Sequence, residues 1–89
     1  MMYDFIVGGM LVATPAAIDT FNGQELHDCL LRHLNADWGD LGEEDKASND
    51  EALRNGGRLL SSYKLNGKKM WIITEADHSV TTILLPEEY

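Results

Sequence analysis

The stretch RLLSSYKLNGKKMWIITEA, residues 58–76, predicts a β-hairpin, and the rest of the fold follows from it. Asn66-Gly67 suits the two left-handed positions of a type I′ turn between antiparallel strands. A two-residue turn at this point pairs Leu65 with Lys68. Counting outward from that pair assigns each side chain of the hairpin to one of two faces, because strand side chains alternate.

A third strand, residues 80–85, follows Asp77-His78 and ends at Pro86. If Asp77-His78 is also a two-residue turn, Ile83 and Leu85 join the face of the hairpin that helices would cover. The opposite face then presents five apolar side chains, which is more apolar surface than a free sheet face usually shows. These side chains are Leu60, Trp71, Ile73, Val80 and Leu84.

We therefore expect the protein to self-associate, as a homodimer, through this second face or its edge. Two-fold dimers need a self-complementary patch, and Trp71 would be the anchor, since buried tryptophans dominate interface energetics. The alternative lies within the chain itself. The apolar segment from Phe5 to Ala13 predicts a strand that either extends the sheet or folds across this face.

Three helices are predicted between that first strand and the hairpin. Thr14-Pro15 is a helix start that leads to about residue 21. Asn22 with Glu25 forms a capping box for a helix that ends near residue 34. Asp40 with Glu43 is a third capping pair, for a helix that Gly56-Gly57 ends. The expected fold is a single α+β domain over residues 1–89, in the order β-α-α-α-β-β-β. An antiparallel three-stranded meander carries helices on one face, and the N-terminal strand joins the sheet.

Charge is distributed unevenly along the chain, whose formal net charge is −8. Residues 1–57 carry eleven acidic and three basic groups, whereas residues 58–89 carry four of each. Nucleic-acid binding needs a basic footprint, so direct DNA or RNA binding is not expected. The lone Cys29 favours a reducing cytoplasm. The apolar run near the N-terminus is about half the ~20 residues that span a bilayer, so no membrane association is expected.

The acidic run from Asp37 to Glu51 is the most distinctive feature of the sequence. One interpretation is a solvated helix start whose carboxylates meet the positive end of the helix dipole. The other is an electronegative surface for a basic partner, with the candidate residues Asp37, Trp38, Asp40, Glu43 and Glu44. Trp38 is either a plug over the core or a contact residue. A calcium loop is not predicted, because Gly39, Leu41 and Ser48 occupy positions that need oxygen-rich side chains.

No catalytic or metal motif stands out. His27 and His33 are six residues apart on one predicted helix, so with Cys29 they do not form the single face that metal ligands need. Glu75, Asp77 and His78 cluster near a turn and could serve a hydrolase, although turns collect such residues anyway. No cofactor and no metal site are predicted.

Three segments carry a resemblance to a known family. They are Val12-Ala13-Thr14-Pro15, the run from Asn35 to Leu41 followed by Glu44-Asp45-Lys46 and Asn49, and the C-terminal runs from Trp71 to Asp77 and from Thr81 to Tyr89. Together they resemble small bacterial proteins of plasmids and other mobile elements, labelled "plasmid-related protein" or "type I restriction endonuclease subunit M". A methyltransferase subunit needs a cofactor-binding domain and an Asn/Asp-Pro-Pro-aromatic motif, and this chain has neither. The resemblance implies a bacterial, mobile-element setting and no site residues.

The function expected from these observations is that of a non-enzymatic protein-interaction module. An acidic mimic of DNA that blocks a host nuclease or restriction system is the alternative, because it would combine the charge asymmetry with the mobile-element resemblance. A small hydrolase built on Glu75, Asp77 and His78 is a further alternative. It would require these residues to converge in a pocket with Asp37 or Asp40.

Overall fold

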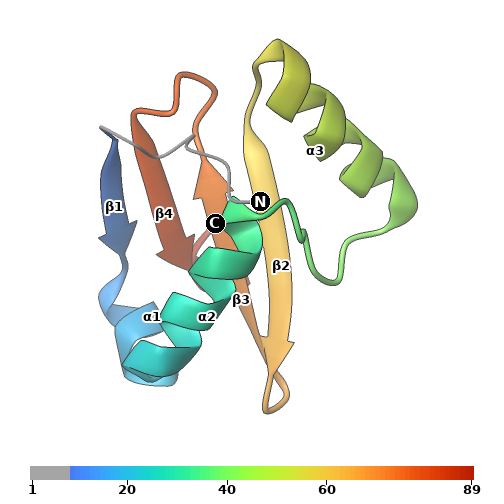
Figure 1. Cartoon of the computed structure of the whole chain (residues 1–89). Coiled ribbons are helices and arrows are strands. Elements are labelled where there is room, and N and C mark those ends of the chain that lie inside the picture. The colour runs from blue at the N-terminus through green and yellow to red at the C-terminus, as the bar shows by residue number, and fades with distance from the viewer. Residues whose placement is uncertain (1–8) are drawn as a thin grey trace.

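The computed structural model describes residues 9–89, which form an α+β fold in the expected order β-α-α-α-β-β-β (Figure 1). Its elements are β1 (Met10–Ala13), α1 (Pro15–Thr20), α2 (Gly23–Leu34), α3 (Glu43–Asn55), β2 (Leu59–Leu65), β3 (Lys68–Thr74), β4 (Val80–Leu84) and the short 3-10 helix η1 (Pro86–Glu88). Of the predicted N-terminal strand, Phe5 to Gly8 lie outside the described residues.

The sheet has the strand order β1-β4-β3-β2. β2, β3 and β4 form the predicted antiparallel meander, and Leu65 pairs with Lys68 as the two-residue turn requires. Asn66 and Gly67 both have positive φ angles, 54° and 78°, as a type I′ turn needs. β1 joins the sheet as expected, but as the parallel neighbour of β4, with Met10 opposite Val80.

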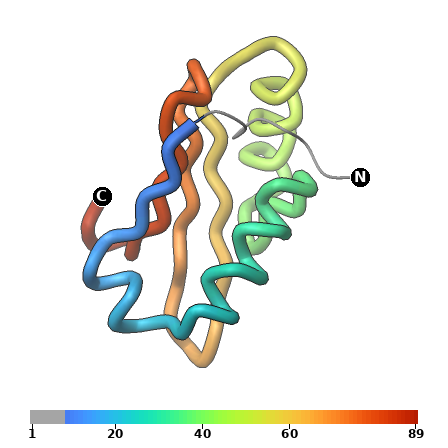
Figure 2. The backbone as a smooth tube through the Cα atoms, turned by 60° about the vertical axis from the view of Figure 1, so that its left-hand side comes forward, coloured from blue at the N-terminus to red at the C-terminus, as the bar shows by residue number. Residues whose placement is uncertain are grey.

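The main core lies between one sheet face and the first two helices. Tyr63, Met70, Ile72 and Ile83 point from the strands toward side chains that α1 and α2 supply, including Cys29. Figure 2 shows α2 and α3 on the same side of the sheet, with the C-terminus on the other. Burial of each large apolar side chain contributes roughly 1.5–3 kcal/mol, so this face anchors the fold.

Local capping defines the first two helices. The Thr14 hydroxyl accepts a hydrogen bond from the Ala17 N–H and starts α1. Asn22 and Glu25 form the predicted reciprocal capping box of α2. The predicted cap of α3 is wrong, since that helix starts after Gly42 and has no side-chain cap. Asp40 is engaged elsewhere, because its N–H donates to the Ser62 carbonyl on β2 at 2.7 Å.

The outer edge of β2 is closed by two other segments of the chain. The Ser62 N–H donates to the Trp38 carbonyl at 3.1 Å, which makes the loop at Gly39 a short parallel neighbour of β2. Gly39 has a φ of 79°, and a Cβ there would lie 2.0 Å from the Ser62 carbonyl oxygen, so only glycine fits. Two residues earlier on β2, the Asn49 side chain forms hydrogen bonds with both the N–H and the carbonyl of Leu60.

Candidate functional site

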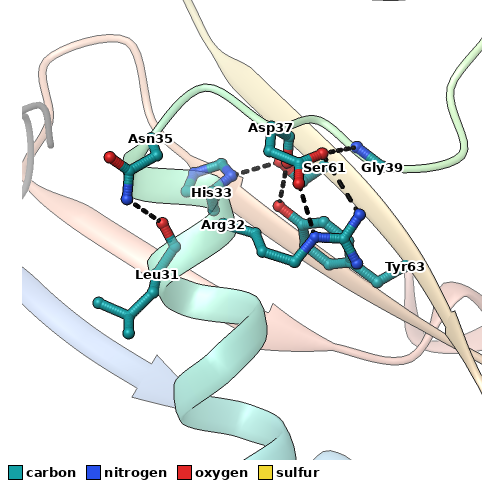
Figure 3. Close-up of polar contacts among 8 residues, drawn as sticks. All are labelled: Leu31, Arg32, His33, Asn35, Asp37, Gly39, Ser61 and Tyr63. Carbon is teal, nitrogen blue, oxygen red and sulfur yellow. Dashed lines mark hydrogen bonds and ion pairs between the residues drawn. The ribbon is translucent and has the colours of Figure 1, made fainter. Parts of the chain in front are cut away.

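The acidic candidate Asp37 is already paired within the chain. Its carboxylate accepts hydrogen bonds from the Arg32 guanidinium at 2.7 and 3.3 Å and from the Gly39 N–H at 3.3 Å (Figure 3). The Arg32 hydrogen bond is the main cause that lowers the pKa of Asp37. The Tyr63 hydroxyl donates to the Asp37 carbonyl at 2.6 Å, so the same residue also ties the loop to the core. Asp37 therefore has a structural role, and part of its charge is offset.

Trp38 is a plug over the core, and the prediction that it contacts a partner is wrong for this structure. Its side chain is 3% exposed and packs with Leu34 and Leu59. The indole N–H donates to the Asp50 carboxylate at 2.9 Å. Its ring meets the His33 ring edge-on, with 5.6 Å between centroids. A buried indole with its one polar group satisfied has nothing left to offer a partner.

The remaining acidic candidates stay on the surface. Asp40, Glu43 and Glu44 are exposed, and the two glutamates lie in the first turn of α3 next to Asp45. Carboxylates there face the positive end of the helix dipole, as the solvated-helix interpretation predicts.

We call the sheet face opposite α1 and α2 the open sheet face. Its predicted residues are Leu60, Trp71, Ile73, Val80 and Leu84. β1 extends it with Met10 and Val12, because these pair with Val80 and Thr82. Two of these side chains, Ile73 and Leu84, are buried, so the face is only partly exposed. The chain turns back through η1 and places Tyr89 edge-on against Trp71, with 5.6 Å between centroids.

A small apolar cavity remains at one end of the open sheet face. It has a volume of about 240 Å³ and is lined by Arg58, Leu60, Trp71, Ile73 and Tyr89. The Arg58 guanidinium lies 5.1 Å from the Tyr89 ring centroid and donates to the Tyr89 hydroxyl. It also approaches Glu75 at 3.6 Å. The cationic group is thus held by its own chain, and the cavity offers mainly apolar surface.

β1 forms the other border of the sheet and is the most exposed apolar segment among the described residues. Met10 is 64% exposed and Leu11 is 49% exposed. The N–H groups of Met10 and Thr14 donate to Ser79 and Ile83, so these residues face β4. Because backbone groups alternate along a strand, those of Leu11 and Ala13 point away from the sheet. Sequence reasoning identified the apolar segment but not that it forms an outer edge of the sheet described here.

The hydrolase candidates do not converge on a pocket. Glu75 faces Arg58, and Asp77, whose carboxylate accepts from the Ser79 N–H at 3.0 Å, lies in the turn between β3 and β4. Hydrogen bonding by the Ser79 side chain, and then by its N–H, lowers the pKa of Asp77. Asp37 lies beside β2, at an outer border of the sheet, whereas Glu75 and Asp77 lie in the connection between β3 and β4. The apolar cavity is not lined by Glu75, Asp77 or His78, and neither is a second, larger depression that Lys64, Lys68 and Lys69 line at the turn between β2 and β3.

The structure brings together a polar cluster that sequence reasoning missed. His33 Nδ1 lies 2.5 Å from Ser61 Oγ, and His33 Nε2 lies 3.0 Å from Thr74 Oγ1, which is itself 2.8 Å from Thr81 Oγ1. All four side chains are buried, and burial lowers the pKa of His33 to about 4. A histidine beside a serine suggests a nucleophile pair. Here no substrate could reach it, because Ser61 is fully buried.

The chain was compared with family models, with curated proteins and with solved structures. No family model, no curated protein and no solved structure matches it. Within residues 9–89, no group of three or more His, Cys, Asp or Glu side chains is arranged to hold a metal ion. Over the same residues, no helix is long and apolar enough to cross a membrane. The resemblance to mobile-element proteins therefore remains a prediction.

Proposed function

We propose that the protein is a non-enzymatic protein-interaction module that forms a homodimer by pairing its β1 edges. The observation that carries this proposal is the contrast between the two borders of the sheet. β2 is closed by the loop at Gly39 and by Asn49, whereas no segment within residues 9–89 pairs with the outer edge of the apolar strand β1. Folded proteins usually protect edge strands with charges, proline or a covering segment, because an open edge pairs with other chains.

Within the described part of the chain, β1 has none of these protections. It reads Met-Leu-Val-Ala, without a charged residue or a proline. Its outward backbone groups belong to Leu11 and Ala13, one donor and one acceptor each. The apolar side chains beside these N–H and C=O groups limit their hydration. Hydrogen bonds to another strand would therefore stabilise them more than hydrogen bonds to water do. A strand added at β1 would satisfy them and cover Leu11 at the same time.

A second copy fits this edge by symmetry. When two β1 strands run antiparallel about a two-fold axis at Val12, Leu11 of one copy lies opposite Ala13 of the other. Such a pair exchanges both of its hydrogen bonds, so the two symmetric pairs form four. Met10 and Val12 of the two copies then meet on the open sheet face. The result is one continuous sheet across the dimer, with an isologous contact of the commonest kind.

The test is the oligomeric state of a proline variant, measured by analytical ultracentrifugation. The Leu11 N–H points away from β4, so Leu11→Pro removes a donor from the free edge without breaking a bond to β4. Leu11→Ala is the matched control, because it also shortens the side chain but keeps the N–H. We expect the wild type and Leu11→Ala to sediment as dimers and Leu11→Pro as a folded monomer, with folding checked by circular dichroism.

Two outcomes would overturn the proposal. The first is a wild type that sediments as a single monomer at high micromolar concentration. The second is a Leu11→Pro variant that stays dimeric while Trp71→Lys splits the dimer. That result would place the contact on the open sheet face around Trp71 and not at the β1 edge.

A further inference from the structure

The hairpin between β2 and β3 extends beyond the end of β4. β4 pairs with β3 only from Trp71 onward, so Lys68 to Met70 have no partner on that side. In Figure 1 this hairpin end projects at the bottom of the molecule. A depression of about 540 Å³ lies here, where the hairpin faces the end of α1 and the start of η1. We call it the lysine depression; its lining includes Lys64, Lys68, Lys69, Thr20 and Glu87.

The lysine depression concentrates positive charge on an acidic protein. Three of the seven basic residues of the chain line it, although the formal net charge is −8. All three lysines are exposed, and none forms an ion pair with a carboxylate among the described residues. Lys64 and Lys69 lie directly opposite each other in the register of the hairpin. Like charges in that position destabilise a sheet, so stability alone does not account for them.

We propose that the lysine depression binds a small phosphate compound with two or more negative charges. Ammonium groups bind phosphate as point charges from several directions. A volume of about 540 Å³ falls within the range of small-molecule sites. The size and the charge of the protein both argue against a long polyanion, because strong nucleic-acid binding neutralises many phosphates and the rest of this surface is acidic. Leu85 and Pro86 add apolar wall on which an organic part could lie.

Pyrophosphate is the probe, titrated by isothermal calorimetry at constant ionic strength. We expect saturable binding at one site per chain. The variant is Lys64→Gln with Lys69→Gln, and the matched control is Lys46→Gln with Arg54→Gln. The control makes the same change in net charge on α3, and neither of its residues lines the depression. Loss of two charge-assisted contacts should weaken binding by at least about tenfold in the variant. The control should change it by no more than about twofold.

Glu87 gives a test with the opposite sign. Its carboxylate lines the depression and repels an anion, so Glu87→Gln should tighten pyrophosphate binding. The lysine variant should remain folded, since removing the opposed charges relieves repulsion. The proposal is overturned if the wild type does not bind pyrophosphate at millimolar concentration. It is also overturned if the α3 control weakens binding as much as the lysine variant, which would indicate a general effect of net charge. Neither result depends on the dimer, because β1 does not line the depression.

Discussion

His33 joins α2 to β2 and β3 through side chains alone. In the neutral ring one nitrogen donates and the other accepts, and the hydroxyls of Ser61 and Thr74 can serve either need. The Trp38 ring lies edge-on against the His33 ring, with 5.6 Å between centroids. Burial therefore lowers the pKa of His33 to about 4, from an ordinary 6.5.

This shift predicts that acid destabilises the fold through His33. The unfolded chain takes up a proton below about pH 6.5, whereas the folded ring stays neutral until about pH 4. The contribution of the neutral His33 ring to the free energy of unfolding is fully present above the unfolded pKa. It falls as the pH drops from about 6.5 toward about 4, because the unfolded state binds more protons there. Urea denaturation should show a loss of roughly 2 kcal/mol from His33 between about pH 7 and pH 5.

His33→Gln is the comparison that isolates this effect, since the carboxylates titrate in both proteins. Its stability at neutral pH should be lower, because the cluster is disturbed. Its stability should nevertheless fall less steeply between pH 7 and pH 5. Parallel pH profiles for the two proteins would contradict a buried neutral His33.

Trp38 offers a second prediction at this scale. Truncating a buried tryptophan over the core removes about 3–5 kcal/mol of stability. We therefore expect Trp38→Ala to lower the free energy of unfolding by that amount. Trp38→Phe keeps a ring but loses the hydrogen bond to Asp50, and we expect a smaller loss. Chemical denaturation measures both. A contact residue would instead tolerate alanine with little change in stability.

At the scale of elements, the two borders of the sheet differ in how their backbone groups are satisfied. Along β2 the partners come from segments distant in sequence, the loop at Gly39 and the Asn49 amide of α3. The Asn49 side chain accepts from the Leu60 N–H at 3.1 Å and donates to the Leu60 carbonyl at 2.6 Å. It thus acts as a one-residue substitute for a further strand, and it holds α3 against the sheet.

Asn49→Asp tests this role with almost no change in shape. The carboxylate can still accept from the Leu60 N–H, but it cannot donate to the Leu60 carbonyl and places a charge against it. We expect a loss of about 1–3 kcal/mol in the free energy of unfolding. Ser48→Asp adds the same charge at the neighbouring exposed position and should change stability by less than about 0.5 kcal/mol. Equal effects of the two variants would show that the added charge, and not the amide, matters.

At the scale of the whole molecule, the charges divide between two regions. Seven of the fifteen acidic groups lie between residues 37 and 51, in the loop before α3 and along that helix, whereas three of the seven basic residues lie at the end of the hairpin. Two copies that each carry a formal charge of −8 repel one another. The contact proposed at β1 is apolar and hydrogen-bonded, so nothing in it offsets this repulsion.

Salt should therefore strengthen the dimer. Raising the ionic strength from about 0.01 M to about 0.1 M shortens the Debye length from about 30 to about 10 Å and screens the repulsion between copies. We expect the dissociation constant, measured by sedimentation equilibrium, to fall over this range. A dimer built from the acidic segment of one copy against the lysine depression of another would weaken instead, and that result would contradict pairing at β1.

A structural feature could be predicted from the sequence when the interaction that fixes it joins residues close together in the chain. The turn at Asn66-Gly67 sets the register of the hairpin through two residues, and the capping box of Asn22 and Glu25 acts over three. Both were predicted correctly. The cap of α3 was not, because Asp40 bonds to Ser62, 22 positions away, and not to its own helix. The hydrophobic pattern likewise assigned the sheet faces but did not foresee Tyr89 folding back onto Trp71.

The sequence by itself determined the strands, the helices, the meander register and the acidic character of the protein, since turns, caps and side-chain alternation depend on neighbours in the chain. Only the tertiary structure decided which border of the sheet lacks a neighbouring segment among residues 9–89. β1 pairs with β4 some 70 residues away, and β2 is covered by segments that no local pattern directs toward it. The tertiary structure also places His33 in the core and brings the three lysines of the hairpin to one depression. Contacts of that range reflect the packing of the whole chain, where the burial of apolar surface outweighs local preference.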